Sequence, residues 1–228
     1  MTAKNIFTGF VMSMAVDKIS FTSRINFVNT KTFEKFRWGT YIDFRKDLNF
    51  ECSQNAKNPW FAKIVRSDVV KADEFYTDEI RTCSAGGVID SKTGQCAGFH
   101  FYDCAENLEN TDNMLKIIFS LVPNPDRALI LGSKKLRFSN YSIPVFEEIL
   151  KGLKSKIDNV TIFREHIFPY SESDLHYNLK NDTWTIRSMF RYPTDLVHDH
   201  EVIDPQKLEQ CFKEIKIAEG DSINFIKE

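Results

Sequence analysis

The chain has 228 residues, of which 42% are hydrophobic and 27% charged, a composition typical of one globular domain with a substantial core. Its 30 basic and 32 acidic residues give a formal net charge of −2 without a dominant basic stripe, which argues against nucleic acid as a partner. No apolar run reaches the ~20 residues that a membrane-spanning helix needs. We therefore expect a single domain over residues 1–228 that has no membrane span.

The strands and helices that the sequence predicts alternate irregularly, which makes the fold class α+β. In chain order, β-branched and aromatic residues indicate strands, and apolar residues at helical spacing indicate helices. The predicted strands are 18–28, 38–44, 86–90, 97–103, 127–131, 160–165 and 183–190. The predicted helices cover about 111–121, a segment from about 142 to 157, and a segment that follows Asp204-Pro205.

Each predicted helix rests on a local signal. Thr111 is a suitable N-cap for the first helix, which should end before Pro123. Pro144 suits an early position of the second helix. For the third, Leu208, Phe212 and Ile215 are spaced to share one helical face.

The cysteines indicate the compartment. Five cysteines at irregular spacings do not suit a secreted disulfide framework, so we expect reduced thiols in a cytosol. Residues 6–16 are apolar enough for a signal-peptide core, but polar residues interrupt them and no small-residue cleavage site follows. The five are Cys52, Cys83, Cys96, Cys104 and Cys211.

Cys83 and His100 are the candidate nucleophile and base. The turn SKTG (91–94) separates two short predicted strands, so the chain should fold back and bring His100 beside Cys83. A thiolate is the reactive form of cysteine, and a neighbouring imidazole favours its formation. The base also needs an orienting group, for which Thr77 could supply an oxygen. Small residues after the cysteine, namely Ser84, Ala85, Gly86 and Gly87, could leave backbone N–H groups open to an oxyanion.

The segment CSAGGVIDSKTGQCAGFH (83–100), preceded by Thr77, resembles the CheD family of chemoreceptor glutamine deamidases in the separations of its Thr, Cys and His. LILGSKK (129–135), FEEILKGL (146–153), VTIFRE (160–165) and TWTI (183–186) follow in the family's order of later elements. The resemblance covers about residues 70–187. Arg81-Thr82 stands where the family usually has Gly-Ser. The same Cys-strand and His-strand order is similar to cytotoxic-necrotizing-factor-like toxins.

The resemblance implies a mixed β-sandwich-like core with flanking helices, CheD-like and elaborated at both termini. It also implies a protein-glutamine deamidase that needs no cofactor, uses Cys83, His100 and Thr77, and takes a protein substrate. Its place of action would be the cytoplasm, or a host cytosol if the chain is a bacterial effector or toxin. Two alternatives stay open: a partner-binding domain without catalysis, and a transglutaminase or cysteine protease.

Each of these residues also has a simpler interpretation. Cys83 and His100 could be core residues, and Thr77 a cap or turn residue. A zinc site could use Cys83, Cys96, His100 and Cys104, but a strand between Cys96 and Cys104 would hold them about 26 Å apart at ~3.3 Å per residue. Two further histidine groups are weaker candidates: His198 with His200 for a metal, and His166 or His176 for a papain-like base.

Overall fold

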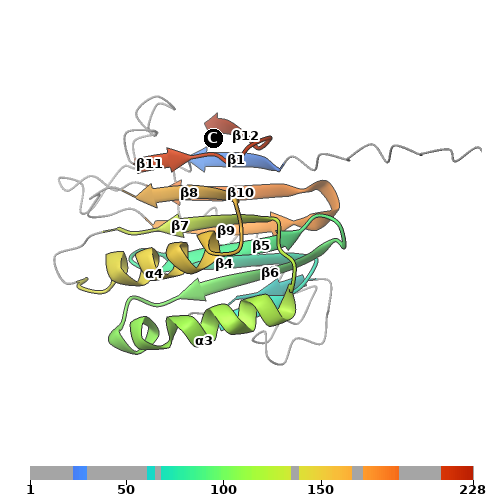
Figure 1. Cartoon of the computed structure of the whole chain (residues 1–228). Coiled ribbons are helices and arrows are strands. Elements are labelled where there is room, and N and C mark those ends of the chain that lie inside the picture. The colour runs from blue at the N-terminus through green and yellow to red at the C-terminus, as the bar shows by residue number, and fades with distance from the viewer. Residues whose placement is uncertain are drawn as a thin grey trace, which may run out of the picture.

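The computed structural model describes residues 23–29, 61–64, 68–134, 139–165, 172–189 and 212–227. Their strands form two six-stranded sheets that pack face to face (Figure 1). One sheet has the order β12-β1-β10-β9-β4-β2 and the other the order β11-β8-β7-β5-β6-β3. The strands of the first sheet are β1 (Arg24–Asn29), β2 (Phe61–Lys63), β4 (Glu74–Ile80), β9 (Glu172–Asn178), β10 (Thr183–Met189) and β12 (Ser222–Lys227). Those of the second are β3 (Asp68–Lys71), β5 (Ser84–Asp90), β6 (Gln95–Phe101), β7 (Arg127–Gly132), β8 (Asn159–Glu165) and β11 (Phe212–Lys216).

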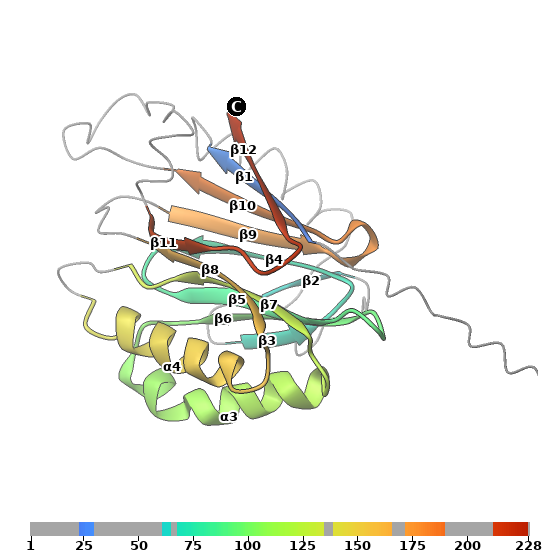
Figure 2. The same ribbon diagram turned by 45° about the horizontal axis from the view of Figure 1, so that its top comes forward.

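Two helices, α3 (Ala105–Leu121) and α4 (Ser142–Lys154), form a third layer on the outer face of the second sheet (Figure 2). Their buried faces pack on one side of the central strands, where Val88, Phe99 and Ile130 belong to the same hydrophobic cluster as helix residues Phe146 and Ile149. The molecule is therefore an α+β sandwich, in agreement with the predicted fold class.

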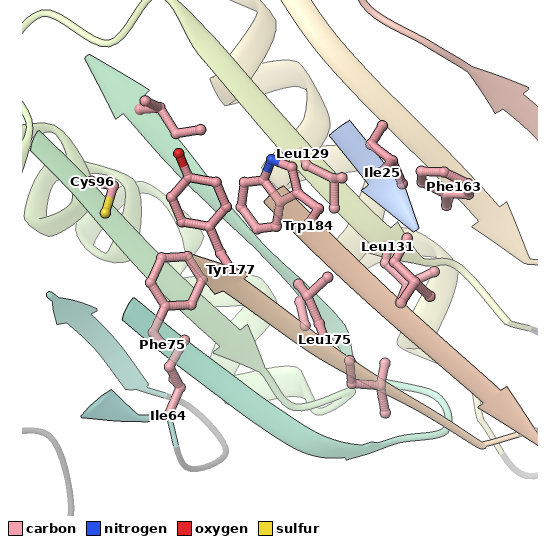
Figure 3. Packing of buried hydrophobic residues seen from close by; sticks show 14 of the residues in the cluster. Ile25, Ile64, Phe75, Cys96, Leu129, Leu131, Phe163, Leu175, Tyr177 and Trp184 are labelled. Atoms are coloured by element: carbon pink, nitrogen blue, oxygen red, sulfur yellow. The ribbon is translucent and has the colours of Figure 1, made fainter. Parts of the chain in front are cut away.

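The other face of the second sheet packs against the first sheet. Odd-numbered residues of β5 and β7, such as Ile89 and Leu129, contribute to this inter-sheet core. Across from them, Phe75, Tyr177 and Trp184 come from the first sheet, with Tyr177 and Trp184 ring centroids 4.2 Å apart (Figure 3). Both faces of β5 are thus buried, which explains why this strand is apolar and glycine-rich instead of alternating.

Segments from both ends of the chain complete the sheets. β1 lies between β10 and β12 and is parallel to both. β11 pairs antiparallel with β8 at the edge of the second sheet. The elaborations outside residues 70–187 are therefore part of the two-sheet packing where the structure describes them.

The strands predicted within 86–90, 97–103, 127–131, 160–165 and 183–190 and the helix from Ser142 are all present. Residues 24–28 of the first predicted strand lie in β1, whereas 38–44 lie outside the described residues. The predicted start of α3 at Thr111 is wrong, because the helix begins at Ala105. Thr111 is buried inside the helix, and its hydroxyl donates to the carbonyl of Asn107 (2.7 Å). A hydroxyl that bonds one turn back can stay in a helix interior.

The third predicted helix is also wrong where the structure describes it, since Phe212–Lys216 is the strand β11. A β-bulge interrupts its pairing between Phe212 and Glu214. The extra residue lets Phe212 and Ile215, three positions apart, both pack on the core. That spacing imitates a helical face.

Gly86 is required by close packing on the helix side of β5. A Cβ there would lie 2.1 Å from the carbonyl oxygen of Leu129 and 2.7 Å from the Phe99 ring. We expect Gly86→Ala to lower the free energy of unfolding by about 2–3 kcal/mol, measured by urea denaturation. The control is Gly152→Ala in α4, where the added methyl meets only the flexible Leu115 side chain and helix propensity improves. Equal losses in the two variants would contradict this account.

Candidate active site between the two sheets

Cys83 directly precedes β5 and contributes to the inter-sheet core. Its side chain is 2% exposed. The alternation of β5 explains this direction, since Ala85 and Ile89 also belong to the inter-sheet core. The candidate nucleophile therefore lies at one end of the sandwich, between the sheets.

His100 reaches the same place from the neighbouring strand. The predicted hairpin is present: residues 91–94 form its turn, and the Gly94 N–H donates to the Asp90 carbonyl (2.9 Å). In the register of this hairpin, His100 lies opposite Ala85. Cys83 is two residues before Ala85, so Cys83 and His100 are diagonal neighbours on one face of the pair. His100 is fully buried.

Thr77 approaches His100 from the opposite sheet. It lies on β4, next to a bulge between Thr77 and Ile80. Its Oγ1 is 2.5 Å from His100 Nδ1 and donates a hydrogen bond to the Ile64 carbonyl (3.0 Å). The predicted contact between Thr77 and His100 is confirmed, whereas the interpretation of Thr77 as a turn or cap residue does not fit a strand position.

The two hydrogen bonds of Thr77 assign the tautomer of His100. A hydroxyl has one proton, and the Ile64 carbonyl can only accept it. Thr77 Oγ1 must then accept from His100 Nδ1–H, and in a neutral ring the lone pair is on Nε2. This is the nitrogen that a general base would use.

The predicted oxyanion residues divide into two groups. Gly86 and Gly87 lie inside β5, where they pair with β6 and β7. Their missing side chains make room for neighbouring rings, which for Gly87 are those of Phe75 and Trp184. Ser84 is the first residue of β5 and is buried. Backbone N–H groups for an oxyanion would therefore come from the start of the strand.

The other described cysteines have different surroundings. Cys96 lies on β6, and its thiol donates to the Ala72 carbonyl (2.8 Å). Burial raises the pKa of Cys96 to about 12. Cys104 precedes α3 at its N-cap position. Within the described ranges, no three His, Cys, Asp or Glu side chains lie close enough to hold a metal ion.

Of the remaining candidate histidines, the structure describes His176 alone. His176 Nε2 is 2.8 Å from Glu74 Oε1. Burial opposes ionisation of Glu74, but the hydrogen bond and charge of His176 outweigh it, so the pKa of Glu74 is lowered. His176 is therefore engaged with Glu74 on β4. His166, His198 and His200 lie outside the described residues.

Two charged residues at the same end were not anticipated from the sequence. Lys134 follows β7 and is fully buried, and its Nζ is 3.7 Å from Glu165 Oε2 at the end of β8. Ser173 of the first sheet donates to Glu165 Oε1 (3.2 Å). Lys134 stands inside LILGSKK, where nothing in the local sequence distinguishes a buried lysine from an exposed one.

Comparison with known proteins adds no relative. Neither a scan against protein-family models nor a search of the curated proteins finds a match to this chain. Among the described helices, neither is long and apolar enough to cross a bilayer.

Proposed function

We propose that the chain is a cysteine-dependent amidohydrolase that converts a protein glutamine side chain to glutamate. The observation that carries this proposal is the contact between Thr77 and His100, which orients the imidazole of a residue placed diagonally to Cys83. A base whose tautomer is fixed by a third group is the arrangement that activates a nucleophile. The CheD-like sequence pattern over 70–187 and the α+β sandwich support the same proposal.

In the proposed reaction, His100 Nε2 takes the thiol proton and Cys83 Sγ attacks the carboxamide carbon. The tetrahedral oxyanion accepts hydrogen bonds from backbone N–H groups at the start of β5. The His100 imidazolium then protonates the carboxamide nitrogen, and the C–N bond breaks. Ammonia departs, and the substrate acyl group remains bound to Cys83 as a thioester. His100 next deprotonates water, which attacks the thioester carbon, and the C–S bond breaks to release glutamate and the thiol.

The burial of Cys83 favours a second candidate function. A thiol that is 2% exposed cannot meet a glutamine on another protein until the surrounding segments open. If they do not open, the chain is a partner-binding domain on the same framework. Arg81-Thr82, in place of the Gly-Ser of the CheD pattern, agrees with this second candidate.

A mass-spectrometric survey of glutamine-to-glutamate conversion tests the proposal. Cells would express the wild type, Cys83→Ala, or Cys96→Ala as the matched loss of a buried cysteine. We expect converted sites that disappear with Cys83→Ala and persist with Cys96→Ala. An unchanged set of sites in the Cys83→Ala cells would support the partner-binding candidate. Glutamines joined to amines instead of hydrolysed would make the enzyme a transglutaminase.

A further inference from the structure

The ion pair of Lys134 and Glu165 is unusual because both charged groups are buried. The two side chains are 0% and 6% exposed, and a separation of 3.7 Å is an ion pair but not a short hydrogen bond. Removing two charges from water costs several kcal/mol per ion, which a loose pair recovers incompletely. Burial raises the pKa of Glu165, against the opposing effects of Lys134 and Ser173. Such costly groups concentrate at functional sites.

The sheet topology places this pair in one row with the candidate catalytic residues. Neighbouring strands have the order β8-β7-β5-β6. β7 and β8 are parallel, and β5 is antiparallel to β7 and to β6. Glu165, Lys134, Cys83 and His100 therefore all lie at the same end of these strands. Adjacent strands are ~4.8 Å apart, so Lys134 is one strand from Cys83 and Glu165 is two.

At this end of the sheet, the backbone at the end of β7 packs closely against the backbone at Cys83. Gly132 ends β7 with φ 148°, and a Cβ on it would lie 2.7 Å from the Cys83 carbonyl oxygen. The chain then turns through Ser133, a buried non-glycine residue with φ 70°. This conformation is costly for serine and directs the following Lys134 into the interior. Lys134 meets Glu165, which contacts Ser173 of the opposite sheet, so the pair lies between the sheets as Cys83 does.

We propose that Lys134 and Glu165 are a positioning pair that sets the electrostatic environment of Cys83 from the ends of β7 and β8, one and two strands away from the thiol. This inference rests on the proposed function, because it concerns the same nucleophile. A neighbouring cation favours a thiolate and the oxyanion that follows it, whereas a neighbouring anion disfavours both. The pair thus acts from the opposite side to His100.

One other buried titratable group at this end is Asp68 of β3, which lies opposite His100 in the strand register. The titratable groups near Cys83 along the chain are less enclosed. Asp78 and Asp103 are half-buried and Arg81 is exposed, so water screens their charges more strongly. They remain unchanged in every variant below. Any difference in the pH profile of Cys83 alkylation between the variants then comes from the substitution at Lys134 or Glu165.

The test is the pH profile of Cys83 alkylation by iodoacetamide, followed by peptide mapping. The pH at half-maximal rate is insensitive to a constant accessibility factor. We expect Lys134→Met to move it upward by about one pH unit and Glu165→Gln to move it downward, because the two substitutions remove opposite charges. Lys134→Arg should restore the wild-type midpoint. A general loosening of the fold would not move the two neutral variants in opposite directions.

The outcomes separate this inference from the proposed function. If both neutral variants leave the midpoint unchanged, or move it the same way, the positioning pair is overturned even where His100→Ala still shifts it. If Lys134→Met does not fold, the direction of the Glu165→Gln shift decides alone. If the opposite shifts occur but no glutamine conversion depends on Cys83, the electrostatic inference stands and the deamidase proposal fails.

Discussion

Replacing Arg127 with Met is expected to lower the free energy of unfolding by about 3–5 kcal/mol. Arg127 begins β7, and its side chain is 7% exposed. Its guanidinium lies 3.0 Å from Asp182 Oδ2 and 3.6 Å from Asp221 Oδ1. Burial raises the pKa of Asp221, although hydrogen bonds and Arg127 oppose this. Removing the cation would leave two carboxylates together without compensation, in a domain whose whole stability is about 5–15 kcal/mol.

This cluster also joins both ends of the chain to the core. Ser23, just before β1, accepts from Arg127 (2.6 Å) and donates to Asp182 (2.8 Å). Asp221, just before β12, accepts from the Ser23 N–H (2.8 Å) and from Thr161 of β8 (3.1 Å). Loss of Arg127 should therefore loosen β1 and β12 as well as the β7 end.

Urea denaturation measures the effect as a change of midpoint at constant slope. The matched control is Lys151→Met, which removes an exposed ion pair with Glu148 and should change stability by no more than about 0.5 kcal/mol. Adding Asp182→Asn and Asp221→Asn to Arg127→Met should recover part of the loss, since no buried charge then lacks a counter-ion. A loss below about 1 kcal/mol in the single variant would mean that the cluster is not a structural clamp.

Local sequence signals predicted the part of the candidate site that lies on one hairpin. Cys83, just before β5, and His100, on β6, are 17 residues apart, and a four-residue turn joins the two strands, so strand alternation and turn chemistry suffice to relate them. Thr77 was suggested as the orienting group that the base needs and by its fit to the CheD pattern, although it reaches His100 from the other sheet. Lys134 and Glu165 come together only because β7 and β8 are parallel neighbours. No local pattern encodes that pairing.

The sequence did not predict the strands β4, β9 and β11, and the physical reason is the same for all three. β4 (EFYTDEI) and β9 (ESDLHYN) both contain acidic residues, and one of these, Asp174, is only 2% exposed. Their polar content resembles that of loops. β11 was mistaken for a helix because its bulge gives a three-residue apolar spacing. In each case tertiary pairing overrides the local preference.

Replacing His100 with Ala is expected to slow alkylation of Cys83 at neutral pH by about tenfold or more. A free thiol with a pKa of ~8.5 is only a few per cent thiolate at pH 7, whereas an imidazolium partner makes the thiolate the major form. The rates of wild type and variant should converge as the pH passes the free-thiol pKa. The difference between the two proteins is then largest at mildly acidic to neutral pH, where the imidazole can be protonated.

Limited iodoacetamide labelling with peptide mapping follows all cysteines in one experiment, and Cys96 is the internal control. Its burial matches that of Cys83, but its pKa is raised to about 12 and its thiol donates to the Ala72 carbonyl, so it should stay unlabelled in both proteins over this pH range. Labelling of both cysteines at the same rate would report unfolding, not reactivity. If Cys83 reacts no faster than Cys96 in the folded wild type, or if its rate does not depend on His100, the two residues are packing neighbours. The partner-binding function would then replace the amidohydrolase.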